Sequence, residues 1–352
     1  MPEVNVADAD DWVTPAGARL ARGGPDLLVL LDTDFGPDVD DAAAVCQLQG
    51  LANSGETSIV GCTTSSSCDY GPGALDAFNI WHGRGNLTIG AIQTDGLPDT
   101  SNPCSTNQGN FAQPTYENFP RNLGLRGTVT DSTTRYREML SGSADGSVSI
   151  VTIGFCTGLE LLLKSAGDGI DARNGLDLVK DKVKEWVCMG GGHPGSTYRP
   201  WNFHGSNTTK VIDASRYVIA NWPDEVPTHF CPSIMSTHDW GYGQWNTGED
   251  PIAVGTTSDQ YPGHILAEAF KEFGGDRGTH LADPATVLYT VRRDRFSVKQ
   301  GRFIWDTTAD DGSGTWDDDP NGPHTCITGY VGTDQELMDE IEALLWTQEV
   351  AA

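Results

Sequence analysis

The sequence predicts an α/β fold, with an open, mostly parallel, Rossmann-like sheet flanked by helices in a single large domain that ends in a C-terminal hairpin and helix. Strand-like and helix-like segments alternate along residues 27–165, which is the pattern of βαβ units with right-handed crossovers. The first strand-like run, 27–31, contains only Leu and Val, as expected of a parallel strand buried on both faces.

The strands are predicted from short apolar runs rich in β-branched residues and bounded by turn residues. Residues 1–26 are polar and contain Pro and Gly, so we expect an N-terminal arm before a domain that spans residues 27–352. In chain order, the strands are expected at 27–31, 58–64, 87–92, 147–154, 185–195 (where the strand runs into a glycine-rich turn) and 228–233.

The helices are predicted from apolar positions that recur every three or four residues. They are expected from residue 42 onward and at 76–82, 135–140, 157–165, 264–270 and within 279–291. Residues 301–322 have the pattern of a β-hairpin with acidic, glycine-rich turns, and residues 335–346 that of a closing helix. Residues 93–130 are rich in Gly, Pro, Asn and Thr, and we expect a long functional loop there.

The composition excludes some partners. Acidic residues outnumber basic residues 49 to 22, which gives the 352-residue chain a formal charge of −27 and argues against a nucleic acid or an anionic membrane as partner. The sequence contains no run of about twenty apolar residues, so no transmembrane helix is predicted. The N-terminus lacks the basic start and apolar core of a signal peptide. Both a cytoplasmic and a secreted location therefore stay open.

The eight cysteines form no C-x-x-C pair of the kind that binds zinc. Cys46, Cys156 and Cys188 stand in apolar segments and are predicted to be small core residues. The other five are expected in or near loops, where a secreted protein would form disulfides: Cys62, Cys68, Cys104, Cys231 and Cys326.

An acidic cluster directly follows the first strand. Asp32, Asp34, Asp38, Asp40 and Asp41 surround a Gly-Pro turn, at the carboxyl end of a strand, where α/β proteins bind ligands. So many carboxylates repel one another unless a cation lies among them, and a hard ion such as Ca²⁺ or Mg²⁺ prefers oxygen ligands. The alternative is an acidic turn that caps the following helix, but one or two carboxylates would suffice for that.

With its sequence DTDFGPDVDD, this cluster resembles the acidic motif of the inosine-uridine-preferring nucleoside hydrolase family, in the branch with the longer DTDxGxDxDD spacing. The resemblance implies that Asp34 and Asp41 bind Ca²⁺. It leaves open whether Asp38 or Asp40 faces the ribose. The segment DAFNIWHGRGNLTIG at residues 76–90 resembles a stretch of the same branch.

Three further segments resemble family elements. The turn Gly154–Gly158 stands in the place of the family's GPLTN turn and implies a metal bond from the Thr157 backbone carbonyl, although Thr157 as a helix N-cap explains the spacing equally well. Asn202 matches the Asn of a ribose-binding E-x-N element, whose Glu is replaced by Pro200. Asp283, followed by Pro, corresponds to the last metal carboxylate.

The leaving-group acid is the element that departs most from the family. Many members have a His immediately before the last metal Asp, and this chain has Ala282 there. His280 lies two residues earlier, and the aromatic loop 237–245 adds His238 and Tyr242 as candidate acids. The same loop contains Trp240, which suits stacking on a heterocyclic base.

The resemblance implies a Ca²⁺-dependent hydrolase that cleaves the N-glycosidic bond of purine or pyrimidine ribonucleosides to free base and ribose, as in nucleoside salvage. Asp34 would then accept a proton from the attacking water. Relatives suggest a homodimer or homotetramer. Two other classes remain open: a non-catalytic homologue that binds Ca²⁺ and nucleoside, and a phosphatase of the haloacid-dehalogenase type, whose Asp-x-Asp start would make Asp32 the nucleophile.

Overall fold

A computed structural model describes residues 26–105, 109–195, 197–232, 258–274, 279 and 281–347. It contains one nine-stranded sheet in the order β3-β2-β1-β4-β5-β6-β9-β7-β8. The pairs from β3 to β9 in this order are parallel, and β7 is antiparallel to both β9 and β8. The predicted fold class, a mostly parallel open sheet flanked by helices, is therefore confirmed.

The strands match the apolar runs of the sequence closely. They are β1 Leu28–Thr33, β2 Ser58–Thr64, β3 Thr88–Ala91, β4 Val148–Thr152, β5 Val183–Met189, β6 Thr228–Cys231, β7 Phe296–Trp305, β8 Gly314–Asp318 and β9 His324–Tyr330. The predicted hairpin is formed by β7 and β8. Strand β9 was not predicted, and it lies between β6 and β7.

The helices include several short ones that the sequence pattern did not indicate. The α-helices of the described residues are α1 Asp40–Asn53, α2 Gly71–Trp81, α3 Ala112–Asn118, α4 Ser132–Ser141, α5 Thr157–Lys164, α6 Gly175–Lys182, α7 Trp201–His204, α8 Thr209–Asn221, α9 Ile265–Phe273, α10 Ala282–Val291 and α11 Asp334–Leu345. The expected long loop 93–130 contains α3 and the 3₁₀ turn η1, Arg126–Thr128.

Alternate residues of the central strands supply two separate hydrophobic cores. Val29 and Leu31 of β1 belong to the core that α1 and α10 cover, whereas Leu30 belongs to the core on the other face, with α4, α5 and α6. The strands β4 and β5 divide in the same way. This follows from the period of two along a strand, because successive side chains point to opposite faces. An entirely apolar run is thus explained by burial on both sides.

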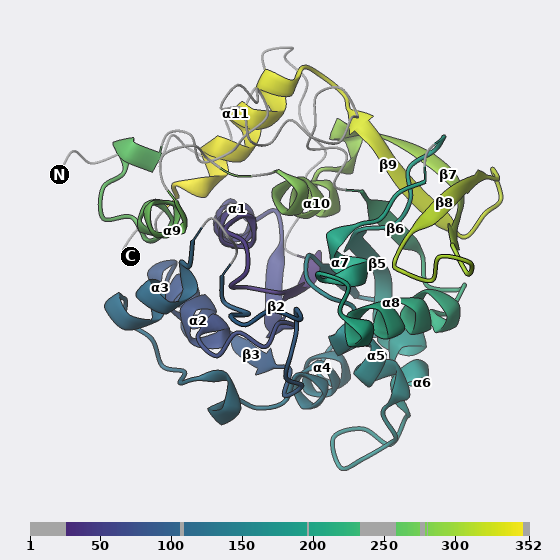
Figure 1. The fold of residues 1–352 in the computed structure, drawn as a ribbon, viewed down its shortest axis with the longest axis horizontal. Helices are drawn as coiled ribbons and strands as arrows, with labels where there is room; N and C mark the ends of the chain where they lie inside the picture. The colour runs from purple at the N-terminus through teal and green to yellow at the C-terminus, as the bar shows by residue number, and fades with distance from the viewer. Residues whose placement is uncertain are drawn as a thin grey trace.

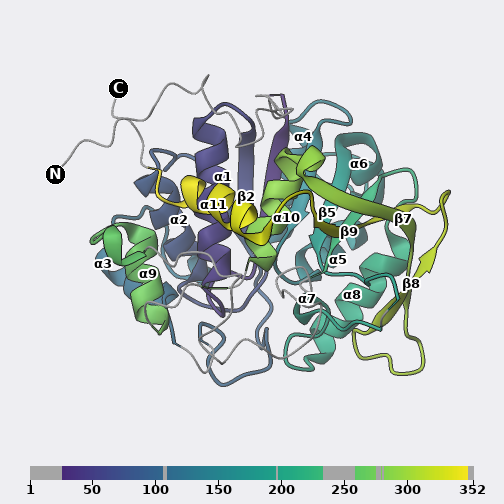
Figure 2. The ribbon, with the colours of Figure 1, turned by 90° about the horizontal axis from the view of Figure 1, so that it is seen from above.

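Helices cover both faces of the sheet. In Figure 1, α1 and α10 lie side by side near the centre of the molecule, with α11 beyond them, while α5, α6 and α8 lie together on the other side. Figure 2, seen from above, shows α11 crossing in front of α1 and α10. The β7–β8 hairpin projects at one end of the sheet in both views. No helix of the described residues is long and apolar enough to span a bilayer.

The cysteines differ from the prediction in three places. Cys62, Cys231 and Cys326 lie in strands β2, β6 and β9 as buried free thiols, and they were wrongly expected near loops. Cys46, Cys156 and Cys188 are buried, as predicted. The disulfide of the described residues joins Cys68 to Cys104.

A buried arginine fixes the carboxyl end of α10. The Arg292 guanidinium donates hydrogen bonds of 2.8 and 2.7 Å to the Glu56 carboxylate and of 2.7 Å to Glu340 of α11. All three residues are at most 5% exposed. Glu340 also pairs with Arg295 at 3.1 Å, so the loss of Arg292 would fall mainly on Glu56. A buried ion pair of this kind costs more to break than a surface pair.

We therefore expect Arg292→Met to destabilise the fold by about 3–5 kcal/mol, since it would remove the buried cation that binds Glu56 through two hydrogen bonds. Urea unfolding would measure the change in the free energy of unfolding. The control is Arg216→Met, which removes a half-exposed arginine paired with Asp213 and Asp310 and should cost less than about 1 kcal/mol. Equal losses in the two variants would contradict this account of Arg292.

Candidate active site

The sheet topology defines where a ligand site is expected. The order β3-β2-β1-β4-β5-β6 reverses direction between β1 and β4. In open α/β sheets, ligands bind beyond the carboxyl ends of the strands at this switch point. Asp34 follows the end of β1, and the turn before α5 follows the end of β4. The acidic cluster predicted from the sequence therefore lies at the switch point.

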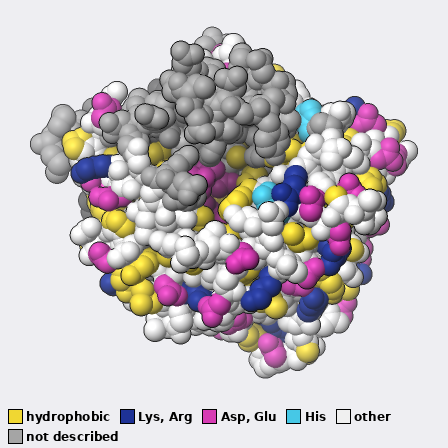
Figure 3. Space-filling model, in the orientation of Figure 1, with side chains coloured by type: hydrophobic (Ala, Val, Ile, Leu, Met, Phe, Trp, Pro, Cys, Tyr) yellow, Lys and Arg dark blue, Asp and Glu magenta, His cyan; other side chains and the backbone are white. Residues whose placement is uncertain are grey.

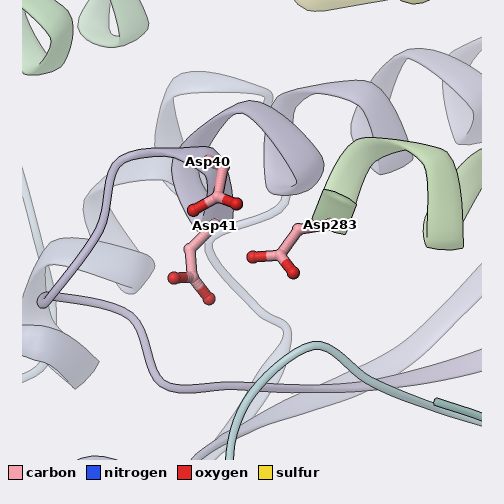
Figure 4. A group of neighbouring side chains, drawn as sticks. All are labelled: Asp40, Asp41 and Asp283. Atoms are coloured by element: carbon pink, nitrogen blue, oxygen red, sulfur yellow. The ribbon is translucent and has the colours of Figure 1, made fainter. Parts of the chain in front are cut away.

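Three carboxylates converge there. Asp40 and Asp41 are the first two residues of α1, and Asp283 is the second residue of α10. Their closest oxygens lie within 4.8 Å of one another, and Figure 4 shows the three side chains pointing toward a common point from two helix ends. Each is at most 6% exposed. The amino ends of both helices carry a partial positive charge, which stabilises anions.

These acids do not cap their helix. The N-cap residue of α1 is Val39, and no side-chain capping hydrogen bond is present. The Asp41 carboxylate instead accepts a hydrogen bond from the Thr33 hydroxyl, while the Asp38 carboxylate accepts one of 2.8 Å from the backbone N–H of Val39. The geometry of α1 therefore gives none of these acids the N-cap position, although Asp40 and Asp41 do lie in the first turn of the helix.

Asp34 and Asp38 interact electrostatically with the three converging carboxylates. Burial, together with the charges of Asp38 and Asp32, raises the pKa of Asp34 to about 7, and burial raises the pKa of Asp38 to about 6. Burial and the neighbouring carboxylates raise the pKa values of Asp40, Asp41 and Asp283 well above the usual range. Without a cation, the folded protein therefore opposes ionisation of all five groups.

The donor set fits a hard divalent cation. All the groups are carboxylate oxygens, the ligands that Ca²⁺ prefers. The Asp283 Oδ1 atom is buried and has no hydrogen-bond partner among the described residues, so one lone pair remains for a ligand. In the space-filling view, acidic side chains lie in a depression near the middle of this face (Figure 3). A cation bound among these carboxylates would reduce their mutual repulsion and give the Asp283 Oδ1 atom a partner.

The turn after β4 approaches the end of β1 closely. An added Cβ at Gly154 would lie 2.3 Å from the backbone nitrogen of Asp34, so a glycine is required for this contact. Thr157 is the first residue of α5, and the N-cap residue is Cys156. The N-cap role for Thr157 is thus wrong, and the hydroxyl of Thr157 donates to the Ser65 carbonyl at 3.4 Å.

Asn202 is held at the ends of two strands. Its amide donates hydrogen bonds of 2.7 Å to the Ile153 carbonyl and 3.3 Å to the Met189 carbonyl. The residue is 1% exposed, and its Oδ1 atom has no partner among the described residues. An oriented amide with an unused acceptor can bind a hydroxyl group, because its own N–H groups are already satisfied.

The sequence did not single out several residues that support the site. The Thr33 hydroxyl also accepts the Phe35 N–H at 3.1 Å, and a hydrogen bond from the Trp201 side chain favours ionised Asp34. Asp32 is fully buried and accepts hydrogen bonds from Tyr136 at 2.7 Å and Thr63 at 2.9 Å. Of the supporting residues Thr33, Trp201, Tyr136 and Thr63, only Thr33 stands within the acidic motif.

Four predicted residues lie outside the described residues: His238, Trp240, Tyr242 and His280. Ala282 is the first residue of α10 and is 4% exposed. Pro284 is the third residue of this helix and falls in the first turn, where the N–H groups lack intrahelical acceptors.

Metal-free protein should lose stability as pH rises from about 4 to 7. The carboxyl groups of Asp34 and Asp38 have a pKa of 3.8 when unperturbed, against about 7 and about 6 in the fold. Folding therefore favours their protonated forms, and this contribution is lost as pH rises through the folded values. Ca²⁺ competes with these protons, so the stabilisation it gives should grow over the same range.

Melting curves in chelator and in millimolar Ca²⁺, recorded at each pH, would test this. The difference between the two melting temperatures at each pH cancels the effect of titratable groups outside the site, because those groups are present in both samples. We expect the gap in melting temperature to widen from pH 5 to pH 7.5. A gap that is constant or narrows would contradict the proposed competition between protons and the cation.

No family model matches the sequence, and none of the curated proteins searched matches it. Solved structures do resemble it. A plant nucleoside hydrolase, PpNRh1, superposes with a TM-score of 0.63 at 14% identity, covering 91% of this chain and 99% of that one. The inosine-uridine-preferring nucleoside hydrolase of Bacillus anthracis gives a TM-score of 0.57 at 15% identity over 90% and 98% of the two chains.

A third similar structure is the type III effector protein XopQ, solved in complex with adenosine diphosphate ribose. It gives a TM-score of 0.59 at 17% identity and covers 92% of this chain and 94% of that one. These matches span nearly the full length of each structure. The chain therefore has the nucleoside hydrolase fold.

Proposed function

We propose that this protein is a Ca²⁺-dependent hydrolase that cleaves the N-glycosidic bond of ribonucleosides to free base and ribose. The observation that carries this proposal is the convergence of Asp40, Asp41 and Asp283 at the switch point of a nucleoside hydrolase fold. Cleavage of this bond has a transition state in which the sugar carries positive charge. An acidic site that binds the sugar therefore suits the reaction.

Asp34, Asp41, Asp283 and the backbone carbonyl of Thr157 would hold the cation. When bound, Ca²⁺ would supply a positive charge that orients water and sugar hydroxyls and makes that water easier to deprotonate. The hard oxygen donors and the unpartnered Asp283 Oδ1 atom support this assignment.

The other roles follow from what each side chain can do. Asp34 would accept the proton of the attacking water, as a carboxylate within a buried site. Asp40 or Asp38 would accept hydrogen bonds from ribose hydroxyls, and Asn202 would offer its unused Oδ1 to another. Holding the sugar in this way lowers the activation barrier, because the reacting groups are already close together and correctly oriented.

The base would be bound by the aromatic loop, with Trp240 stacking on the heterocycle. His238, Tyr242 or His280 would protonate the leaving base, since Ala282 cannot. As the resemblance suggests, the protein would act as a homodimer or homotetramer, which light scattering on purified protein would check.

The two alternatives differ in their support. A haloacid-dehalogenase phosphatase would need Asp32 as its nucleophile, but this residue is fully buried beneath Tyr136 and Thr63, where no phosphate could reach it. A non-catalytic binding protein remains the second candidate, because the XopQ structure of the same fold was solved with adenosine diphosphate ribose.

The test is incubation of the purified protein with a panel of purine and pyrimidine ribonucleosides and with ADP-ribose, followed by assays of free base and free ribose. We expect turnover that requires Ca²⁺ and stops in excess chelator. Binding of nucleoside or ADP-ribose by calorimetry without any release of base would favour the binding protein. Turnover that persists in excess chelator would contradict the metal-dependent mechanism.

A further inference from the structure

The Cys68–Cys104 disulfide joins two loops beside the acidic site. Cys68 lies between β2 and α2, and Cys104 lies between β3 and α3, 36 residues later. Cys68 is fully buried and Cys104 is 4% exposed. Ser67 and Leu97 connect the same loops by hydrogen bonds of 2.8 to 3.0 Å. The disulfide is their covalent link among the described residues.

The disulfide packs on the turn that carries the carboxylates. An added Cβ at Gly36 would lie 2.8 Å from the Cys68 Sγ atom and 3.6 Å from the Cys104 Cα atom. At the neighbouring residue, the Phe35 carbonyl would lie 2.5 Å from a Cβ added at Gly71. The turn between β1 and α1 is therefore in direct contact with the bridged loops, without space for even one methyl group.

This turn sets the relative position of the site carboxylates. It begins after Asp34 and ends at Asp40 and Asp41, the first residues of α1. Repulsion among these charges tends to spread them apart, and α1 has no side-chain cap that would fix its first turn. The bridged loops are in direct contact with the turn and so restrict its movement, and the disulfide holds those loops together.

We propose that the Cys68–Cys104 disulfide is a positioning element for the cation site, so that the affinity for Ca²⁺ depends on the oxidation state of this pair. The proposal rests on the proposed function, because it assumes a cation among these carboxylates. A dithiol reductant would break the S–S bond and leave two thiols. It would itself become a disulfide, so that two electrons and two protons are transferred.

The experiment compares Ca²⁺ binding to the wild-type protein and to the double variant Cys68→Ser/Cys104→Ser by calorimetry. Melting curves in chelator would first establish a temperature at which both are folded. We expect the dissociation constant for Ca²⁺ to rise roughly 10- to 100-fold, the range typical when a group that orients metal ligands is lost. Turnover at saturating Ca²⁺ should stay near the wild-type value, because the carboxylates themselves are unchanged.

Two controls separate this effect from a general loss of stability. Cys326→Ala removes a buried thiol on β9, away from the turn, and should leave Ca²⁺ affinity unchanged even if it lowers the melting temperature. Gly36→Ala keeps the disulfide but adds a methyl group against it, at a residue with φ of 146°, and should weaken Ca²⁺ binding.

Alkylation and mass spectrometry should find six free thiols in protein purified without reductant.

Equal Ca²⁺ affinities of the wild-type and the double-serine variant would overturn the proposal, as would the finding of eight free thiols before reduction. A weakened affinity in Cys326→Ala equal to that of the double variant would also overturn it, since the effect would then be one of stability. Wild-type protein that binds no Ca²⁺ at all would instead refute the proposed cation site.

Discussion

Asp41→Asn is expected to abolish Ca²⁺ binding and, with it, nucleoside turnover. Asparagine keeps the shape of the side chain but removes the charge that a hard cation requires. Asp41 is 1% exposed and lies within 4.8 Å of the Asp40 and Asp283 carboxylate oxygens, so water cannot easily replace it. The loss in kcat/KM should exceed the roughly 10- to 100-fold typical of an outer-shell partner.

Metal content, calorimetric Ca²⁺ binding and kcat/KM would be measured on the same preparations. Asp283→Asn should behave in the same way, because it removes a ligand from the other helix. The matched control is Asp213→Asn, an exposed residue paired with Arg216, which should keep wild-type binding and turnover. If Asp41→Asn binds Ca²⁺ as tightly as the wild type does, the assignment of Asp41 as a ligand is wrong.

Removal of the leaving-group acid should slow natural nucleosides far more than an activated one. Protonation of the base by a general acid typically contributes about 10²- to 10⁴-fold. Because Ala282 cannot supply this proton, we expect His238→Ala or Tyr242→Phe, more than His280→Ala, to reduce turnover of natural ribonucleosides by such a factor. p-Nitrophenyl riboside needs no protonation and should be affected much less.

The measurement is the ratio of kcat/KM for a natural ribonucleoside to that for p-nitrophenyl riboside in each variant. Trp240→Leu is the control from the same loop, since loss of the aromatic ring that would stack on the base should raise KM for natural nucleosides without removing an acid. If His238→Ala, Tyr242→Phe and His280→Ala each lower both substrates equally, none of the three residues is the acid.

Most of the sheet could be predicted because its strands carry a local signal. The run before Asp32 is entirely apolar and appears as β1, buried on both faces, and residues 58–64 form β2 as predicted. Helices α6 and α8 and strand β9 were missed. Their sequences mix polar and apolar residues, and β9 has only Cys326 and Ile327 buried. Such elements are formed by packing against the rest of the fold rather than by a strong pattern.

The candidate site was likewise predictable only in part. The cluster Asp34–Asp41 was visible because its residues are adjacent in the sequence, but composition and spacing give no reason to place Asp283 beside it. Only the family resemblance predicted that pairing, and the structure brings Asp40, Asp41 and Asp283 together. The metal-binding and sugar-binding roles stay predictions. Tyr136, which supports Asp32 from 104 residues away, had no signal at all.

The position of β9 has a consequence for how the chain folds during synthesis. Among the described residues, β9 is the last strand along the chain, yet it pairs with β6 on one side and with β7 on the other. Until it emerges from the ribosome, β6 has an unpaired edge and the β7–β8 hairpin has no partner that joins it to the sheet. Unpaired strand edges invite intermolecular pairing. Chains truncated before residue 324 should therefore aggregate more readily than the full-length protein.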